Sequence, residues 1–125
     1  MTDIVQKRVA IIGAGTMGHG IAAIAATAGY LVSITDARAE ILPTAFKHIT
    51  STLDAGVKRG KLTAQDRDAA LARVNLRESI VECVSDANII IEAVPERLDL
   101  KQALFNEIDT VAPFFNERSV ILESA

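Results

Sequence analysis

Three glycines, Gly13, Gly15 and Gly18, follow a short apolar run at residues 9–12 and have the spacing G-x-G-x-x-G. An apolar helical stretch comes next, and Asp36 stands eighteen residues after the last glycine, at the end of a second apolar run. A strand, a glycine loop, a helix and a carboxylate about 20 residues further on are the parts of a dinucleotide site. The pattern therefore indicates a site for a ligand that carries a diphosphate and a ribose.

Each glycine has its own task in such a site. Gly13 allows the tight turn out of the strand, Gly15 lets a pyrophosphate approach the backbone, and Gly18 lets the helix pack closely. The helix dipole favours the phosphate charge at the helix start. The loop residues expected to form the cofactor site are Gly13, Ala14, Gly15, Thr16, Met17 and Gly18. The alternative interpretation is an ordinary glycine loop between two core elements.

Asp36 also bears on the choice of cofactor. A carboxylate at the end of the second strand accepts hydrogen bonds from both ribose hydroxyls and repels a 2′-phosphate, which favours NAD over NADP. Arg38 is close in sequence, and an arginine at such a place can accommodate that phosphate. Its alternative role is that of a solvated residue in the first turn of a helix.

Composition narrows the class of protein. The chain has 125 residues, 50% of them hydrophobic, which predicts one domain with a helix-covered parallel sheet. A net charge of −3 argues against nucleic acid as a partner. The single cysteine, Cys83, has no cysteine or histidine cluster around it, so we expect a reducing compartment and no metal. We expect a cytoplasmic protein with no membrane-spanning run and no signal peptide.

Apolar periodicity and turn signals divide the chain into alternating strands and helices. We expect strands near residues 8–12, 30–35, 74–76, 88–93 and 119–123, and helices near 16–28, 39–57, 79–84 and 97–112, with another short helix capped by Thr63. This alternation implies right-handed crossovers and a parallel sheet. The predicted fold is a Rossmann-type, doubly wound α/β domain in three α/β/α layers, spanning residues 1–125 and incomplete at its C-terminal edge.

Four separate segments should meet at one edge of this sheet, since ligands of a doubly wound sheet bind at the carboxyl ends of its strands. They are Gly13, Asp36, residues 93–96 and residues 123–125. Glu92 comes just before the third segment. An acid that ends a buried strand is costly unless it is hydrogen-bonded, so Glu92 either holds the loop or faces the cofactor cleft.

Three stretches carry a more specific pattern. The first is V-A-I-I-G-A-G-T-M-G-H-G-I-A at 9–22, and the second is the second helix with its basic loop through residues 57–62, which contains G-K-L at 60–62. The third is I-E-A-V-P-E-R-L-D-L-K at 91–101, followed by Ala103, Leu104 and Phe105. Through them the chain, from about residue 7 to 125, resembles the NAD-binding domain of the L-3-hydroxyacyl-CoA dehydrogenases. That family oxidises the 3-hydroxyl of an acyl-CoA to a ketone and passes hydride to NAD. The resemblance implies a dehydrogenase of fatty-acid β-oxidation or of hydroxybutyryl-CoA metabolism.

The resemblance also implies site residues in the third stretch. They are Glu96 and Lys101, which join Ala93 and Val94 from the converging strand ends as the additional cofactor residues. Glu96 is expected near the nicotinamide ribose, and Lys101 in contact with the cofactor and the CoA end of the substrate. On the residues alone, Glu96 can instead be an acid favoured by a helix dipole, and Lys101 a solvated helix lysine.

Thr52 and Arg59 stand where family members place a hydroxyl and a cation that touch CoA. Arg59 can equally belong to an ordinary basic turn. The reaction needs a histidine base to take the hydroxyl proton. His19 lies in a variable position of the motif and His48 faces outward on the second helix, so neither is expected to be catalytic.

The catalytic His and its paired Glu come later in the family's sequence, so no catalytic residue is expected here. A family motif A-S-N-T-S-S would begin at Glu123; Ser124 matches it, while Glu123 and Ala125 depart from it. The family's helical domain, which covers the substrate and forms the dimer, is also not seen. We therefore expect the cofactor half of a longer, homodimeric enzyme, which alone binds NAD weakly and has no dehydrogenase activity.

Other functions stay open. One is a related β-hydroxyacid or sugar-acid dehydrogenase with the same nucleotide half. Another is a standalone NAD-binding module that senses the cofactor or regulates a partner. Flavin or adenosyl-methionine binding is compatible with the fold, although the E-A-V-P-E segment at 92–96 favours neither.

Overall fold

The computed structural model describes residues 7–93 and 120–123. Its strands form one sheet in the order β3-β2-β1-β4-β5, and all neighbouring pairs are parallel. The strands are β1 (Arg8–Ile12), β2 (Leu31–Thr35), β3 (Val74–Leu76), β4 (Ile89–Glu92) and β5 (Val120–Glu123). The order changes direction between β1 and β4, which is the switch point of a doubly wound sheet. The predicted Rossmann-type sheet is confirmed.

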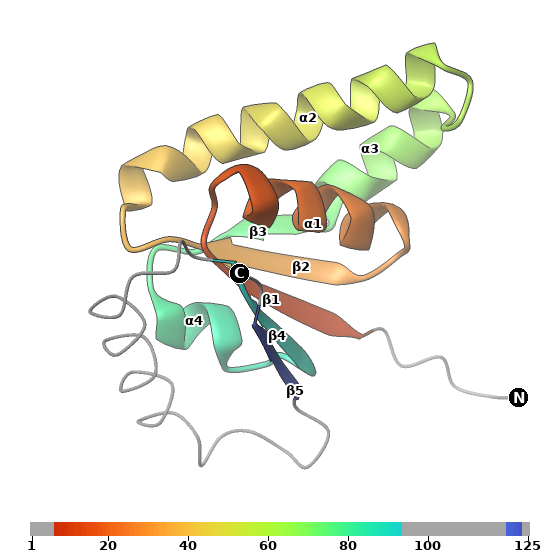
Figure 1. Cartoon of the computed structure of the whole chain (residues 1–125). Helices are drawn as coiled ribbons and strands as arrows, with labels where there is room; N and C mark the ends of the chain where they lie inside the picture. The colour runs from red at the N-terminus through yellow and green to blue at the C-terminus, as the bar shows by residue number, and fades with distance from the viewer. Residues whose placement is uncertain (1–6, 94–119, 124–125) are drawn as a thin grey trace, which may run out of the picture.

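Helices cover both faces of this sheet. They are α1 (Thr16–Thr27), the 3-10 turn η1 (Ala39–Ile41), α2 (Leu42–Lys58), α3 (Ala64–Ala72) and α4 (Ile80–Val84). Figure 1 shows α1, α2 and α3 on one side of the sheet and α4 on the other. The three-layer α/β/α arrangement is thus confirmed, and the helix expected at 97–112 lies outside the described residues.

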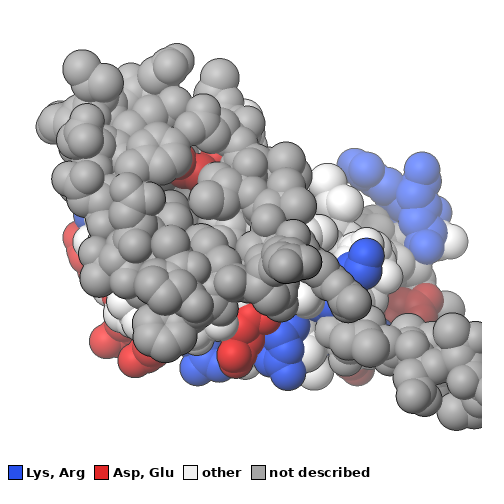
Figure 2. Space-filling model, turned by 90° about the horizontal axis from the view of Figure 1, so that it is seen from below, with Lys and Arg blue, Asp and Glu red and all other residues white. Residues whose placement is uncertain are grey.

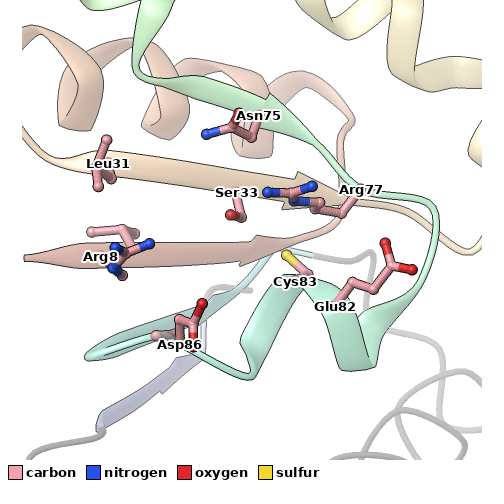
Figure 3. A pocket seen from close by; sticks show the side chains of 10 residues that line it. Arg8, Leu31, Ser33, Asn75, Arg77, Glu82, Cys83 and Asp86 are labelled. Atoms are coloured by element: carbon pink, nitrogen blue, oxygen red, sulfur yellow. The ribbon is translucent and has the colours of Figure 1, made fainter.

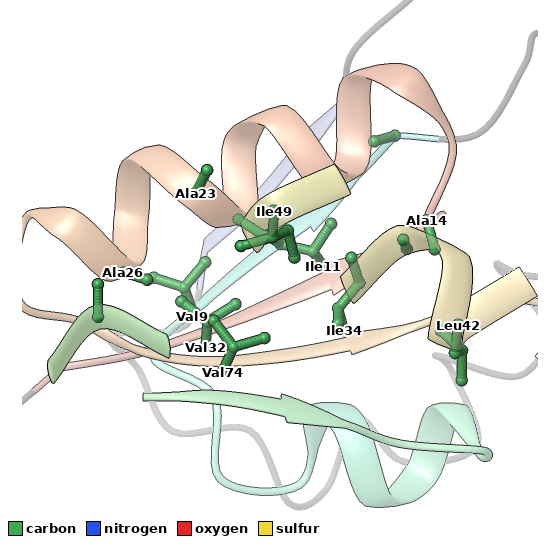
Figure 4. Close-up of a cluster of buried hydrophobic side chains, with 14 of the residues drawn as sticks. Val9, Ile11, Ala14, Ala23, Ala26, Val32, Ile34, Leu42, Ile49 and Val74 are labelled. Carbon is green, nitrogen blue, oxygen red and sulfur yellow. The ribbon is translucent and has the colours of Figure 1, made fainter. Parts of the chain in front are cut away.

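Alternation along β1 explains why its residues are all apolar. Neighbouring side chains of a strand point to opposite faces. Val9 and Ile11 pack with α1 and α2 in the larger core cluster (Figure 4), whereas Ala10 and Ile12 pack against α4. All four are at most 4% exposed. A strand covered on both faces needs a continuous apolar run, as the sequence has here.

The second predicted helix begins later than expected. Residues 39–41 form η1, and the α-helix starts at Leu42, with Pro43 within its first two positions. Proline has no N–H and fits only the first turn of an α-helix, so the α-helical hydrogen-bond pattern starts around it. The predicted cap at Thr63 is confirmed. Its hydroxyl accepts a hydrogen bond from the Asp66 N–H at 3.0 Å, and the Asp66 carboxylate accepts one from the Thr63 N–H at 3.3 Å.

The surface of the described residues carries charges of both signs. Seen from below, basic and acidic side chains lie next to one another (Figure 2). Among the described helices, none has the length and apolar character that crossing a membrane requires.

Candidate cofactor-binding site

The glycine loop joins β1 to α1 at the carboxyl edge of the sheet. Gly13 has a φ of 113°, which a residue with a β-carbon rarely adopts. Its N–H donates to the carbonyl of Thr35 at 2.8 Å, so the turn is tied to the end of β2. The predicted task of Gly13, a tight turn out of the strand, is confirmed.

Gly18 brings the first turn of α1 against this loop. A β-carbon on Gly18 would overlap the carbonyl oxygen of Gly13 and lie 2.7 Å from its carbonyl carbon. Only hydrogen fits between the helix and the turn, so the predicted close packing at Gly18 is confirmed. Backbone atoms, not a flexible side chain, define this limit.

Gly15 and the two residues after it are exposed, whereas Gly13, Ala14 and Gly18 are buried. Among the residues that the structure describes, a β-carbon built on Gly15 meets nothing within 4 Å, and this residue is the N-cap of α1 without a side-chain hydrogen bond to the helix start. The first turn of α1 holds no acidic residue. No described residue therefore caps or covers Gly15 at the helix start, and this geometry fits a diphosphate.

Asp36 lies against the same loop. One carboxylate oxygen accepts a hydrogen bond from the Ala14 N–H and the other from the Arg38 N–H, each at 2.8 Å. Each carboxylate oxygen has two acceptor positions, so Asp36 keeps capacity for ribose hydroxyls. Asp36, which is expected to bind the cofactor, thus also anchors the glycine loop. Its position in the sequence did not predict this second role.

The end of β4 joins this edge. The Ala93 N–H donates to the carbonyl of Ile12 at 2.8 Å, and Glu92 is 1% exposed. Glu92 is in register with Ile12 on β1 and with Glu123 on β5. The expected convergence of strand ends is therefore present for the described residues. Val94, Glu96, Lys101, Ser124 and Ala125 lie outside them.

The candidate CoA residues lie in the second half of α2 and at its end. The Thr52 hydroxyl donates to the carbonyl of His48 at 3.0 Å, and Arg59 is the exposed C-cap residue. Because an α-helix rises 1.5 Å per residue, Arg59 lies about 25 Å from the start of α2. Arg59 thus lies at the far end of α2 from Asp36, and Thr52 lies between them, one helical turn after His48.

His19 and His48 form a contact that sequence analysis missed. Their rings stack with centroids 4.7 Å apart and an interplanar angle of 15°. Although His48 is exposed, as expected, its ring covers His19 rather than pointing freely outward. Partial burial, and secondarily the neighbouring His48, lower the pKa of His19. No signal in the sequence could show this pair, since the two residues are 29 positions apart and meet only when α1 packs on α2.

A separate hollow of about 50 Å³ lies on the α4 side of the sheet (Figure 3). Its lining includes Arg8, Ser33, Arg77, Glu82, Cys83 and Asp86. It contains neither the glycine loop nor Asp36. Burial raises the pKa of the Cys83 thiol to about 12, so this thiol is not an activated nucleophile. Within residues 7–93 and 120–123, no three His, Cys, Asp or Glu side chains are grouped to hold a metal.

These features define the class of the protein as a Rossmann-type dinucleotide-binding domain. The family model described as "3-hydroxyacyl-CoA dehydrogenase, NAD binding domain" matches residues 8–124. The chain belongs to this NAD-binding family, which confirms the resemblance drawn from its three sequence stretches.

Relatives and solved structures agree with this assignment. The chain is 42% identical over 107 residues to 3-hydroxyadipyl-CoA dehydrogenase of Escherichia coli K12, covering 86% of this chain and 22% of the relative. It is 35% identical over 111 residues to 3-hydroxybutyryl-CoA dehydrogenase of Mycobacterium tuberculosis H37Rv, covering 89% and 38%. The crystal structure of (S)-3-hydroxybutyryl-CoA dehydrogenase from Ralstonia eutropha matches with a TM-score of 0.85 and 33% identity, covering 97% and 41%. The chain thus spans 22% to 41% of the length of these relatives.

Proposed function

We propose that the whole protein is an NAD-dependent dehydrogenase that oxidises the 3-hydroxyl of a 3-hydroxyacyl-CoA to the 3-oxoacyl-CoA. This chain supplies its NAD-binding domain. The observation that carries the proposal is the open, uncapped start of α1 at Gly15, beside the carboxylate of Asp36. When bound, the nicotinamide accepts the hydride that leaves the substrate.

The exposure of the loop residues suggests which of them contact the cofactor and which shape the loop. Gly15, Thr16 and Met17 are exposed and would contact the diphosphate, mainly through backbone N–H groups. The buried residues Gly13, Ala14 and Gly18 would shape the loop. Asp36 would accept hydrogen bonds from the adenosine ribose. Ala93 and Val94 are proposed as cofactor contacts because they follow β4 at the carboxyl edge of the sheet. Glu96, near the nicotinamide ribose, and Lys101 are proposed on the resemblance.

The cofactor part of the proposal can be tested on this chain by direct titration. The chain has no tryptophan, so the emission of bound NADH can be excited and followed without that background. We expect saturable NADH binding that NAD displaces and that flavin and adenosyl-methionine do not. Tighter binding of flavin or adenosyl-methionine than of NADH would overturn the assignment.

The CoA part of the proposal needs a longer form of the protein with its substrate side. A cation at Arg59 would meet CoA phosphates, and Thr52 and Lys101 would offer further polar contacts. Arg59→Ala should raise KM for acetoacetyl-CoA and leave KM for a pantetheine analogue unchanged. Lys47→Ala, another exposed cation on α2, is the matched control. Equal effects of Arg59→Ala on both substrates would contradict the CoA role.

The catalytic His and Glu are expected by resemblance beyond residue 125, so we expect this chain alone to turn over no acetoacetyl-CoA. Turnover by the isolated chain would refute this expectation. A regulatory response to NAD without dehydrogenase activity in the longer protein would favour the standalone sensing module. A substrate screen on that protein separates acyl-CoA from other β-hydroxyacids. Homodimerisation through the helical domain and a cytoplasmic location complete the proposal.

A further inference from the structure

A charged turn follows β2 and continues the hydrogen-bonded edge of the cofactor site. Asp36 accepts the Ala14 N–H with one oxygen and the Arg38 N–H with the other. The second bond fixes the backbone of Arg38 beside the carboxylate. The next element is η1 (Ala39–Ile41), which carries Glu40. Arg38 and Glu40 therefore lie next to the residue that would hold the adenosine ribose.

Arg38 and Glu40 are paired with each other. The Arg38 Nε lies 3.4 Å from the Glu40 Oε1, with side-chain exposures of 72% and 71%. The backbone N–H of Glu40 and then the Arg38 guanidinium lower the pKa of the Glu40 carboxyl. Glu40 is thus an anion at neutral pH. An exposed pair of this kind adds little to stability, so its importance lies in the charge that it presents.

The turn has a net negative charge. Asp36 and Glu40 are acids and Arg38 is the one base between them, so the formal charge over residues 36–40 is −1 at neutral pH. NADP differs from NAD by a 2′-phosphate on the adenosine ribose, and Rossmann sites that accept NADP place an arginine there. Without Asp36 the net charge would be zero, and Arg38 would still face Glu40. Without both acids it would be +1.

We propose that Glu40 is a second determinant of cofactor specificity, which neutralises Arg38 and so keeps it from binding the 2′-phosphate of NADP. The inference rests on the proposed cofactor site, and Glu40 acts on it only through the charge of Arg38. It implies that replacing Asp36 alone leaves NADPH binding weak, and that the preference changes only when Glu40 is replaced as well.

The test measures NADH and NADPH dissociation constants by fluorescence for the wild-type chain, Asp36→Asn, Glu40→Gln and the double variant. Asn is chosen because its amide oxygen can still accept the Ala14 N–H. Glu40→Gln alone should change NADH binding less than about twofold, because Glu40 lies beyond the ribose acid. In the Asp36→Asn background, Glu40→Gln should tighten NADPH binding about three- to tenfold. Added salt should reduce this gain, because the effect is electrostatic.

Two controls accompany this test. The first asks whether Glu40 acts through Arg38, and the second asks whether the loss of any negative charge has the same effect. Adding Arg38→Ala to the double variant should remove most of the gain in NADPH binding. Glu82→Gln makes the same charge change on α4, on the opposite side of the sheet, and should shift NADPH binding less than about twofold.

Failure of this inference can be told apart from failure of the proposed function. NADH binding by the wild-type chain, with no gain in NADPH binding from Glu40→Gln, would overturn the role of Glu40 only. The same gain with Ala at position 38 would also overturn it. A folded wild-type chain that binds neither nucleotide would overturn the cofactor site and this inference together.

Discussion

The carboxylate of Asp36 accepts a hydrogen bond from the backbone N–H of Ala14 at 2.8 Å. The residue expected to hold the ribose therefore also fixes the loop expected to hold the diphosphate. Loss of this carboxylate should affect both the fold and the cofactor site.

Asp36→Ala should lower the free energy of unfolding by about 1–3 kcal/mol, because the Ala14 N–H in a buried residue loses its acceptor. Urea unfolding followed by circular dichroism measures the change. Asp36→Asn, which keeps an acceptor, should lose less. Asp54→Ala removes a carboxylate from an exposed ion pair with Arg67 and should cost under about 1 kcal/mol. An Asp36→Ala chain as stable as the wild type would contradict the anchoring role.

Gly18→Ala should destabilise the fold by about 3–5 kcal/mol, because the new β-carbon would overlap the Gly13 carbonyl group. Gly20→Ala is the matched control two residues further along α1, where a β-carbon meets no atom of residues 7–93 within 4 Å. It should stabilise the helix by about 0.5–1 kcal/mol. Thermal unfolding gives the melting temperatures of the two variants. Equal melting temperatures would show that α1 can move away from the loop.

Gly15→Ala should weaken NADH binding while leaving the stability of the fold nearly unchanged. Gly15 has a φ of −73°, and no described residue lies within 4 Å of its β-carbon position, so the substitution should change stability by less than about 1 kcal/mol. The added methyl group would stand where the diphosphate approaches, and NADH binding should weaken about tenfold or more. Unfolding midpoints and NADH titrations on the same sample give both numbers. Unchanged NADH affinity would exclude Gly15 from the diphosphate site.

His19 should titrate below its ordinary pKa of 6.5, because burial and the nearby His48 disfavour its charged form. Because the folded-state pKa is the lower one, the contribution of His19 to stability is present above pH 6.5 and is lost as the pH falls through the folded-state pKa. An NMR titration can resolve the two histidines of the chain. His48→Gln should raise the pKa of His19 only in part, since burial is the larger cause. A His19 midpoint at or above 6.5 would contradict this description.

Local sequence determined the parts of the cofactor site that depend on backbone freedom. Gly13 needs a positive φ and Gly18 must lack a β-carbon, and the two residues are only five positions apart. Their spacing in the sequence was therefore enough to predict both roles. The capping box at Thr63 is likewise local. The start of α2 was predicted three residues too early, because the apolar stripe continues through η1 and only Pro43 marks the change in hydrogen bonding.

The partners of individual side chains could not be predicted from the sequence in this way. The Asp36–Ala14 bond depends on the register of β1 with β2, which brings the two strand ends to one level. The His19–His48 stack depends on how α1 packs on α2. The orientation of the Arg38 side chain toward Glu40 depends on the turn after β2.

By itself, the sequence determined the element order, the glycine turn and the acid that follows it, because hydrophobic periodicity and backbone sterics act over a few residues. Only the tertiary structure decided which groups Asp36 binds, that Gly15 lies open while Ala14 is buried, and that the two histidines meet. These relationships arise from packing between segments far apart in the chain, where many side-chain pairings are compatible with the same local pattern.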